Sequence, residues 1–327
     1  MCEDLDQFKP SWSGQVFRPL VEDVIVLTGP TASGKSSVAL ELAEALDGEL
    51  LSLDSIAVYR KMDIGTAKPS ERDRQRVAHH LIDLVDPNQD FSVACYLQAA
   101  HRAVDEIRQR NRVPIFVGGT PMFLKGILRG FNPGPPADWA FRNSIEADLK
   151  QYGVDALKSR LLQVDPLAAH RIHTSDTRRM IRALEFAMIT GTPISHQQTQ
   201  FESTLNSSEC NVFTLAWPRD QLHLRINERV NAMFQNGLID EVSQLLRDYG
   251  ELSRTASQAV GYREIIAGLT HGESVETMME EVAAHTRQLA RRQETWFRSF
   301  DEIRSITTSP KIKTSEIVDQ LVSLINS

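Results

Sequence analysis

The fold of the chain is decided by residues 24–36, which read VIVLTGPTASGKS. The first five form a short β-branched apolar run, the pattern of a buried strand, and Gly29-Pro30 end it with a turn. The residues from Gly29 on match G-x-x-x-x-G-K-[ST]. In such a loop the glycines let the backbone curl, so that successive N–H groups point at phosphate oxygens. The stretch therefore predicts a strand, a phosphate-binding loop and a helix in immediate succession.

Strands and helices alternate beyond this loop. Apolar residues at helical spacing predict helices over 36–46 and 96–109, and short apolar runs predict strands over 50–53 and 113–117. Gly48 is expected to end the first of these helices. Such alternation predicts right-handed crossovers and a parallel sheet. The expected fold class is therefore α/β, a P-loop NTPase-like parallel sheet flanked by helices.

A hinge is indicated by residues 130–138 (GFNPGPPAD), whose three prolines and two glycines interrupt any helix or strand. Helical patterns follow over 141–163 and 176–190, a strand is predicted over 211–217, and the remainder from Arg219 is expected to be helical. We interpret the helices between the two strands as an insertion into one sheet. The expected organisation is a poorly ordered N-terminal extension over 1–20, a phosphate-loop core with C-terminal helices over 21–130 and 210–327, and a helical insertion domain over 131–209.

The composition is that of a folded protein without a membrane span. The chain has 327 residues, 41% hydrophobic and 24% charged, and no apolar run approaches the roughly 18 residues that a spanning helix needs. Its three cysteines lack disulfide or metal-binding spacing and no signal-peptide pattern is present, so we expect a cytoplasmic protein. The net charge of −7 argues against a protein that holds nucleic acid through overall charge. Any nucleic-acid surface must therefore be a local patch.

Three polar side chains are candidates for chemistry at this sheet. Lys35 adds positive potential to the loop, and the Ser36 hydroxyl is expected to bind a Mg²⁺ that bridges two phosphates. Asp54 follows the second predicted strand and should lie at the carboxyl edge of the sheet beside the loop. It is a candidate general base or metal ligand, although an aspartate in this position is also a common turn former. The loop alone leaves open which phosphate-bearing ligand is held.

Seven blocks of sequence together resemble the tRNA dimethylallyltransferases, the IPP transferase family. The blocks occur in family order and are GPTASGKS (29–36), LDSIAVYRKMDIGTAKP (53–69), HHLIDLVDP (79–87), VGGTPMFLKGIL (117–128), RRMIRALE (178–185), AVGYREI (259–265) and TRQLARRQETWFR (286–298). The resemblance implies transfer of the dimethylallyl group of dimethylallyl diphosphate to N6 of the adenosine at tRNA position 37, with release of diphosphate. The implied cofactor is Mg²⁺, and the implied partners are the tRNA anticodon stem-loop and dimethylallyl diphosphate.

The resemblance also implies roles for single residues. Asp54 stands at the position of the general base, and Thr120 matches a threonine near the reacting centre, its alternative role being to cap the next helix. The diphosphate is expected to bind Arg263 and the loop residues Gly29, Pro30, Thr31, Ala32, Ser33, Gly34, Lys35 and Ser36, with Mg²⁺ on Ser36.

A tRNA-binding surface is implied in the same way. Tyr262 is expected to offer a stacking platform for an unpaired base, with a core tyrosine as the alternative. Ala57 stands where many family members carry a glutamine, and the helical insertion is expected to clamp the anticodon stem while the adenine is extruded. The implied tRNA contacts are Asp54, Ser55, Ile56, Ala57, Thr120, Arg142, Arg178, Arg179, Arg182, Gly261, Tyr262, Arg263, Arg291, Arg292, Trp296 and Arg298.

Two other classes of protein share the loop. A small-molecule or nucleotide kinase would require ATP and transfer phosphate, whereas prenyl transfer requires no ATP. A nucleotide-switched binding protein would need an acidic residue such as Asp83 after an apolar run. Turnover without any nucleoside triphosphate separates prenyl transfer from both, and whether ATP also binds the loop is left open. We expect a monomer, because one protomer with an inserted arm can grip one tRNA.

Overall fold

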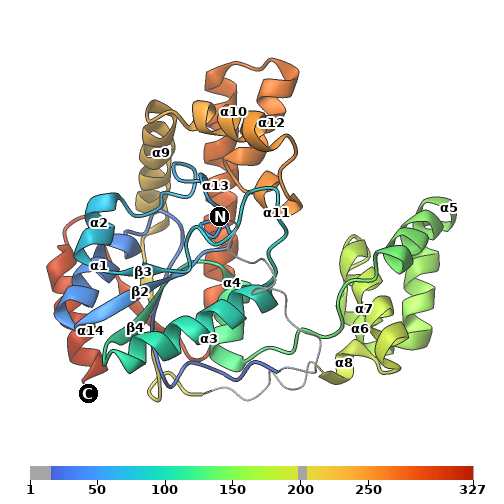
Figure 1. The fold of residues 1–327 in the computed structure, drawn as a ribbon, viewed down its shortest axis with the longest axis horizontal. Helices are drawn as coiled ribbons and strands as arrows, with labels where there is room; N and C mark the ends of the chain where they lie inside the picture. The colour runs from blue at the N-terminus through green and yellow to red at the C-terminus, as the bar shows by residue number, and fades with distance from the viewer. Residues whose placement is uncertain (1–15, 198–204, 327) are drawn as a thin grey trace. The chain divides into compact units, whose positions relative to one another are not determined.

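The computed structural model describes residues 16–197 and 205–326, and its centre is a six-stranded sheet (Figure 1). The strand order is β3-β2-β4-β1-β5-β6, and every neighbouring pair is parallel. The predicted α/β class with a parallel sheet is confirmed. The strands are β1 (Ile25–Thr28), β2 (Gly48–Leu53), β3 (His79–His80), β4 (Val113–Gly118), β5 (Asn211–Ala216) and β6 (Arg304–Thr307).

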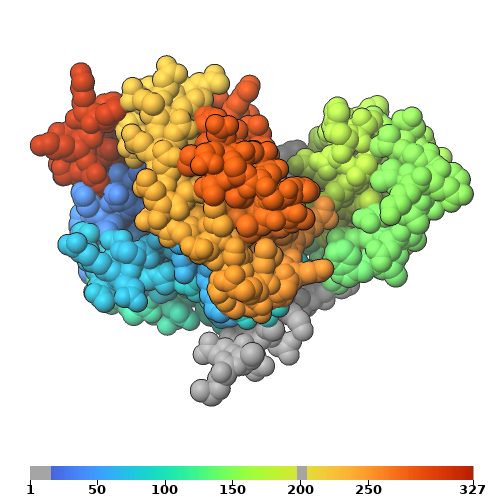
Figure 2. Space-filling model, turned by 90° about the horizontal axis from the view of Figure 1, so that it is seen from above, coloured from blue at the N-terminus to red at the C-terminus, as the bar shows by residue number. Residues whose placement is uncertain are grey.

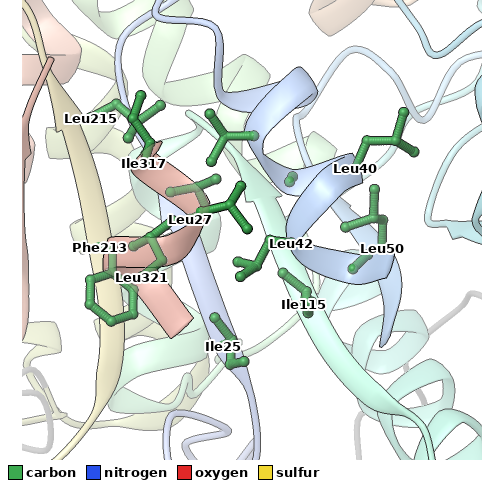
Figure 3. Close-up of a cluster of buried hydrophobic side chains, with 14 of the residues drawn as sticks. Ile25, Leu27, Leu40, Leu42, Leu50, Ile115, Phe213, Leu215, Ile317 and Leu321 are labelled. Carbon is green, nitrogen blue, oxygen red and sulfur yellow. The ribbon is translucent and has the colours of Figure 1, made fainter. Parts of the chain in front are cut away.

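Helices cover both faces of the sheet. On one face, α1 (Lys35–Ala45) and α14 (Thr314–Ile325) enclose a cluster that includes Leu27, Leu42 and Leu321 (Figure 3). Alternate residues of the central strands, such as Val26, Leu51 and Phe116, are also fully buried, and α3 (Val93–Gln109) packs against β2 and β4. Side chains of a strand alternate between faces, so burial of both sets is typical of a parallel sheet between helices. Two further helices of this part are α2 (Glu71–Arg76) and α4 (Pro121–Arg129).

A second apolar cluster joins the C-terminal helices to the loop after β2. Tyr59 and Met62 from the loop pack with Leu245 and Tyr262 in this cluster. Figure 2 shows the segment from α9 to α13, yellow to orange, as one mass against the blue N-terminal part of the core. The helices of this segment are α9 (Arg219–Gln235), α10 (Leu238–Tyr249), α11 (Arg254–Ser257), α12 (Tyr262–His271) and α13 (Val275–Phe297).

The chain divides into two compact units, and the second is a small helical body. The first unit holds the sheet and comprises the described residues 19–128 and 205–326; the second comprises 16–18 and 129–197. Ile145, Leu161 and Met180 are among the residues of the second unit's own core. Its helices are α5 (Trp139–Val164), which is interrupted by non-helical backbone at Gly153, α6 (Pro166–Arg171), α7 (Thr177–Thr190) and α8 (Ile194–Gln197).

Part of the expected N-terminal extension is packed. Residues 1–15 lie outside the described residues, but Phe17 is buried and exchanges two backbone hydrogen bonds with Phe131, at 2.9 and 3.0 Å. Leu20 is fully buried, and its N–H donates to the Ile127 carbonyl at 2.8 Å. Within this segment, Phe17 is therefore bound to the second unit and Leu20 to the first. Within the described residues, no helix has the length and apolar character needed to cross a membrane.

Two sequence predictions about the first unit, which holds the sheet, are wrong. The region after Arg219 is not all helical, because Arg304–Thr307 forms β6 beside β5. Only Ile306 of these four residues is buried, so the segment lacks the apolar run of a central strand. Gly48 does not end α1 but begins β2; a Cβ there would lie 2.9 Å from the Val113 carbonyl oxygen, so the glycine permits close strand packing.

Gly118→Ala should destabilise the protein by about 3 kcal/mol, because the added Cβ would overlap the backbone carbonyl of Leu53 on the neighbouring strand. Neither backbone can move without breaking the β2–β4 ladder. Gly126→Ala in α4 is the matched control, since the atoms nearest to its added Cβ belong to the Leu97 side chain, at 2.8 Å, and not to backbone. Urea unfolding should show a much larger loss for Gly118→Ala; equal midpoints would contradict the backbone clash.

Candidate functional site

A cavity of about 540 Å³ opens at the carboxyl ends of β1, β2 and β4. This is the edge at which parallel α/β sheets bind ligands. Its lining includes Lys35 and Ser36 of the phosphate loop, Asp54, Arg229 of α9 and Gln293 of α13. The structure thus brings the loop and Asp54 together, as predicted. Arg229 and Gln293 were not singled out from the sequence.

The phosphate loop is braced by side chains that bind its backbone carbonyls. Trp217 Nε1 donates to the Ser33 carbonyl and Arg225 Nε to the Ala32 carbonyl, both at 2.8 Å. Ala32 has φ +63°, a conformation that residues other than glycine seldom adopt. Gly34, with φ +84°, precedes α1, whose first turn has no side-chain cap. The first N–H groups of the helix therefore remain available to an anion.

Two cations with poor solvation lie beside this loop. Burial and the neighbouring Arg229 guanidinium lower the pKa of Lys35 to about 8, against a smaller opposite effect of Asp54. Burial likewise lowers the pKa of Arg229, and the side chain of Arg229 makes no hydrogen bond or ion pair within the described residues. Among the residues that the structure describes, Lys35 Nζ donates only to the Pro30 carbonyl, at 3.3 Å. The arrangement favours an anionic ligand, which would restore the solvation that both groups lack.

The turn that begins at Asp54 is hydrogen-bonded to Thr120, which follows β4. Asp54 Oδ1 accepts from the N–H groups of Ile56 at 2.8 Å and Ala57 at 3.2 Å, so one carboxylate oxygen does form a turn. The other oxygen has no hydrogen-bond partner within the described residues. Thr120 Oγ1 accepts from the Ser55 N–H at 3.0 Å, which places Thr120 next to the Asp54 turn. Thr120 itself is not among the residues that line the cavity.

One wall of the cavity is the loop 63–69, and Glu241 holds it. The Glu241 carboxylate accepts from the backbone N–H groups of Asp63, Ile64 and Gly65 at 2.7–3.3 Å. The Tyr262 hydroxyl donates to the same carboxylate at 2.7 Å, and a Cβ on Gly65 would lie 2.5 Å from the Tyr262 ring. Gly65 is therefore required for the close contact with the aromatic ring.

For Tyr262, which borders the cavity, the structure favours the core alternative over a stacking platform. Its side chain is fully buried, and burial raises the pKa of its hydroxyl well above the ordinary value. This burial supports the alternative of a core tyrosine. The sequence could not decide between the two, because the spacing of GYRE does not show which way the ring points. Gly261, with φ +98°, precedes α12, and its N–H donates to Glu264 at 2.7 Å.

Arg263 is also held by Glu264, at 2.5 Å, as is His285, at 2.8 Å. The side chain of Arg263 is 40% exposed and is not among the residues that line the cavity. The structure does not bring Arg263 to the phosphate loop as the diphosphate prediction expected. Arg229 supplies the second cation there instead.

The arginines expected to contact tRNA fall into two classes. On α13, Arg291, Arg292 and Arg298 are exposed, and the partly exposed Trp296 stacks on Phe300 at 6.2 Å between ring centres. On α7 of the second unit, Arg178 and Arg179 are exposed. Arg179 pairs with Asp176 at 3.1 Å, and Arg298, just after α13, donates to the Glu294 carbonyl at 3.2 Å, but both contacts are at the surface. All five groups are therefore accessible to a phosphate backbone, whereas Arg142 and Arg182 bind a buried partner.

That partner is the fully buried carboxylate of Glu185. Arg142 donates to it through Nε and a terminal nitrogen, both at 2.8 Å, and Arg182 through a terminal nitrogen at 2.5 Å. Although burial acts to raise it, these hydrogen bonds hold the pKa of Glu185 below its ordinary value. Arg182 also donates to the carbonyls of Pro133 and Pro135. Within the second unit Arg142 thus fastens α5 to α7, and Arg182 fastens the hinge segment to α7.

The chain is similar over most of its length to proteins of one family. The family model described as IPP transferase matches residues 57–300. A tRNA dimethylallyltransferase of Rhodopirellula baltica is 55% identical, covering 97% of this chain and 98% of that protein, and one of Geobacter sulfurreducens is 44% identical over 86% and 90%. A tRNA isopentenylpyrophosphate transferase of Bacillus halodurans superimposes with a TM-score of 0.67 at 37% identity, covering 93% and 97% of the two chains. A eukaryotic dimethylallyltransferase acting on tRNA gives a TM-score of 0.78 at 25% identity, covering 93% and 78%.

Removing Arg142 or Arg182 should destabilise the second unit, because each substitution leaves the buried Glu185 carboxylate short of a partner. We expect a loss of about 3 kcal/mol for Arg142→Ala, measured by hydrogen exchange of the α5 and α7 amides. Arg178→Ala, on the exposed face of α7, should exchange like the wild type. Equal exchange in the two variants would mean that the ion pair does not hold the unit together.

Binding of inorganic diphosphate should weaken above about pH 8, because Lys35 then loses its proton in the free protein. One proton is taken up on binding in that range, so the dissociation constant should rise about tenfold per pH unit. Calorimetric titrations between pH 7 and 10 measure it. Lys35→Met corrects for titration of the ligand itself, and an unchanged slope in Lys35→Met would contradict the assignment to Lys35.

Proposed function

The chain belongs to the IPP transferase family of tRNA-modifying prenyltransferases, and we propose that its chemistry takes place in the cavity at the carboxyl edge of the sheet. The acceptor is N6 of the adenosine at tRNA position 37, and the donor is dimethylallyl diphosphate. The observation that carries the proposal is the meeting of a braced phosphate loop, two poorly solvated cations and the Asp54 carboxylate in one cavity. Such a cavity suits a reaction with an anionic leaving group and a proton to remove.

The diphosphate is the leaving group of this reaction. The C–O bond between the allylic carbon and the diphosphate breaks, and the bonding electrons stay on the diphosphate oxygen. The N–H groups at the start of α1, with Lys35 and Arg229, stabilise the negative charge that develops there. This role explains why both cations lack an anionic partner in the described part of the chain. The phosphate loop then serves a carbon centre, and phosphorus is not attacked.

The loop also suits a magnesium ion. The Ser36 hydroxyl lines the cavity and makes no hydrogen bond within the described residues, and Mg²⁺ prefers a few such oxygen ligands together with phosphate oxygens and water. Ser36 would hold such an ion beside the diphosphate, where the ion would supply further charge neutralisation.

Asp54 is the general base in the proposal. The exocyclic amine of adenine is a weak nucleophile, because its lone pair is delocalised into the ring. As the new C–N bond forms, one N6 proton passes to the carboxylate oxygen of Asp54 that does not form the turn. The turn fixes the carboxylate, because Oδ1 is held by two backbone N–H groups. Positioned general bases of this kind contribute about 10²- to 10⁴-fold.

The tRNA is held by local basic surface, since the chain as a whole is acidic. The exposed arginines of α13 and those of α7, together with Trp296, supply the candidate contacts. In our proposal the helical unit clamps the anticodon stem while the adenine leaves its stack. One protomer contains all of these parts, in keeping with the expected monomer.

Asp54→Asn should lower prenyl transfer about 10²- to 10⁴-fold, because the amide cannot accept the N6 proton. The substitution is nearly isosteric and keeps an oxygen for the turn, so folding should be unaffected. The assay incubates unmodified tRNA with the protein, Mg²⁺ and dimethylallyl diphosphate without ATP, and detects prenylated adenosine by mass spectrometry.

Three outcomes separate the possibilities. Product from the wild type and little from Asp54→Asn supports both the reaction and the base. Equal product from both proteins would retain the reaction and exclude Asp54 as the base. No product without ATP, but phosphate transfer when ATP is added, would overturn prenyl transfer in favour of a kinase.

A further inference from the structure

Gln293 joins the two halves of the catalytic cavity. Its Oε1 accepts from the Thr31 N–H of the phosphate loop at 2.9 Å, and its Nε2 donates to the Gly119 carbonyl after β4 at 2.8 Å. The residue is 8% exposed, although its neighbours Arg291 and Arg292 on α13 are exposed. A buried amide that makes both hydrogen bonds is satisfied by these partners and holds them at a fixed separation.

The chemistry of the two bonds selects glutamine. One partner is a donor and the other an acceptor, so the side chain must accept with one terminal atom and donate with the other. Glutamate in its charged form only accepts, and leucine does neither. Gly119 leaves the room that the amide occupies, since a Cβ at Gly119 would lie 2.6 Å from Nε2.

Each of the two hydrogen bonds connects Gln293 to the part of the cavity that is proposed to hold one of the reacting groups. Thr31 belongs to the loop proposed to hold the diphosphate. Gly119 precedes Thr120, whose hydroxyl accepts from the Ser55 N–H beside Asp54. The distance between the leaving group and the base therefore depends on the Gln293 amide, which spans them from α13. Misplacement of reacting groups by about 1 Å can cost 10²-fold in rate.

We propose that Gln293 is a positioning residue for prenyl transfer, which acts by holding the phosphate loop at a fixed distance from the Asp54–Thr120 side of the cavity. The inference rests on the proposed function, because it assigns the leaving group to the loop and the proton to Asp54. It concerns geometry between the two sites and not the affinity of either one. Loss of the Gln293 amide should therefore lower the turnover number.

The first test compares Gln293→Leu with Gln288→Leu on the exposed face of the same helix. Gln293→Leu should lower kcat about 100-fold at saturating tRNA and dimethylallyl diphosphate, while the dissociation constant for inorganic diphosphate changes less than about threefold. Gln288→Leu should match the wild type in both. Thermal melting of each variant shows what fraction is folded at the assay temperature.

The second test uses Gln293→Glu and does not depend on survival of the leucine variant. Burial between a backbone N–H and a carbonyl raises the pKa of the new carboxyl, and its protonated form can both accept from Thr31 and donate to Gly119. The kcat of Gln293→Glu relative to the wild type should therefore rise as the pH is lowered from 8 to 5.5. Melting of Gln293→Glu over the same pH range separates this from recovered folding, because the positioning role requires the kcat ratio to rise while the protein stays fully folded at every pH.

The outcomes distinguish this inference from the proposed function. A 100-fold loss in Gln293→Leu with recovery of Gln293→Glu at low pH supports the positioning role. Turnover of Gln293→Leu equal to that of Gln288→Leu, or a flat pH ratio for Gln293→Glu, overturns it while prenyl transfer by the wild type stands. Failure of the proposed function is recognised separately, because the wild type itself then forms no prenylated adenosine.

Discussion

Strands β2 and β4 approach each other so closely at Leu53 and Gly118 that no β-carbon fits between them. Immediately beyond this point the Leu53 carbonyl accepts from the N–H groups of both Gly119 and Thr120 at 3.1 Å. The chain after β4 is thus held to the end of β2. The Asp54 turn and the Thr120 hydroxyl meet because of this contact. The phosphate loop, which follows β1 on the other side of β4, is then joined to the same point through Gln293.

The electrostatics of the cavity are determined by Lys35 and Arg229, which lack an anionic partner within the described residues. A shift of the Lys35 pKa from 10.5 to about 8 corresponds to about 3 kcal/mol of destabilisation of the ammonium in the folded protein. Because the folded-state pKa lies below the unfolded one, this cost is present in full below about pH 8 and disappears as the pH rises to 10.5. The protein therefore keeps a charged site at neutral pH that is unfavourable without an anion. That arrangement ties the stability of the loop to its ligand.

The parts of the site that are formed by residues adjacent in the chain could be predicted from the sequence. The strand, loop and helix over 24–46 and the position of Asp54 follow from local patterns and from the rule that parallel strands end at one edge. Arg229 and Gln293 could not be found in this way, since each reaches the cavity from a helix more than 190 residues beyond the loop. Helical spacing shows which residues share a face but not what that face meets. For the same reason the sequence did not show that Arg142 and Arg182 pair with the buried Glu185.

Several motif residues help to shape the cavity through their contacts with one another. Gly65 and Tyr262, which come from two separate blocks, fit against each other and are held by Glu241, a residue in neither block. Ala57, where many family members carry glutamine, uses its backbone N–H to hold Asp54, and this hydrogen bond needs no particular side chain. The small Ala57 side chain lines the cavity close to Asp54. A larger side chain at position 57 would therefore reduce the volume of the cavity, while the backbone hydrogen bond that orients the Asp54 carboxylate would remain.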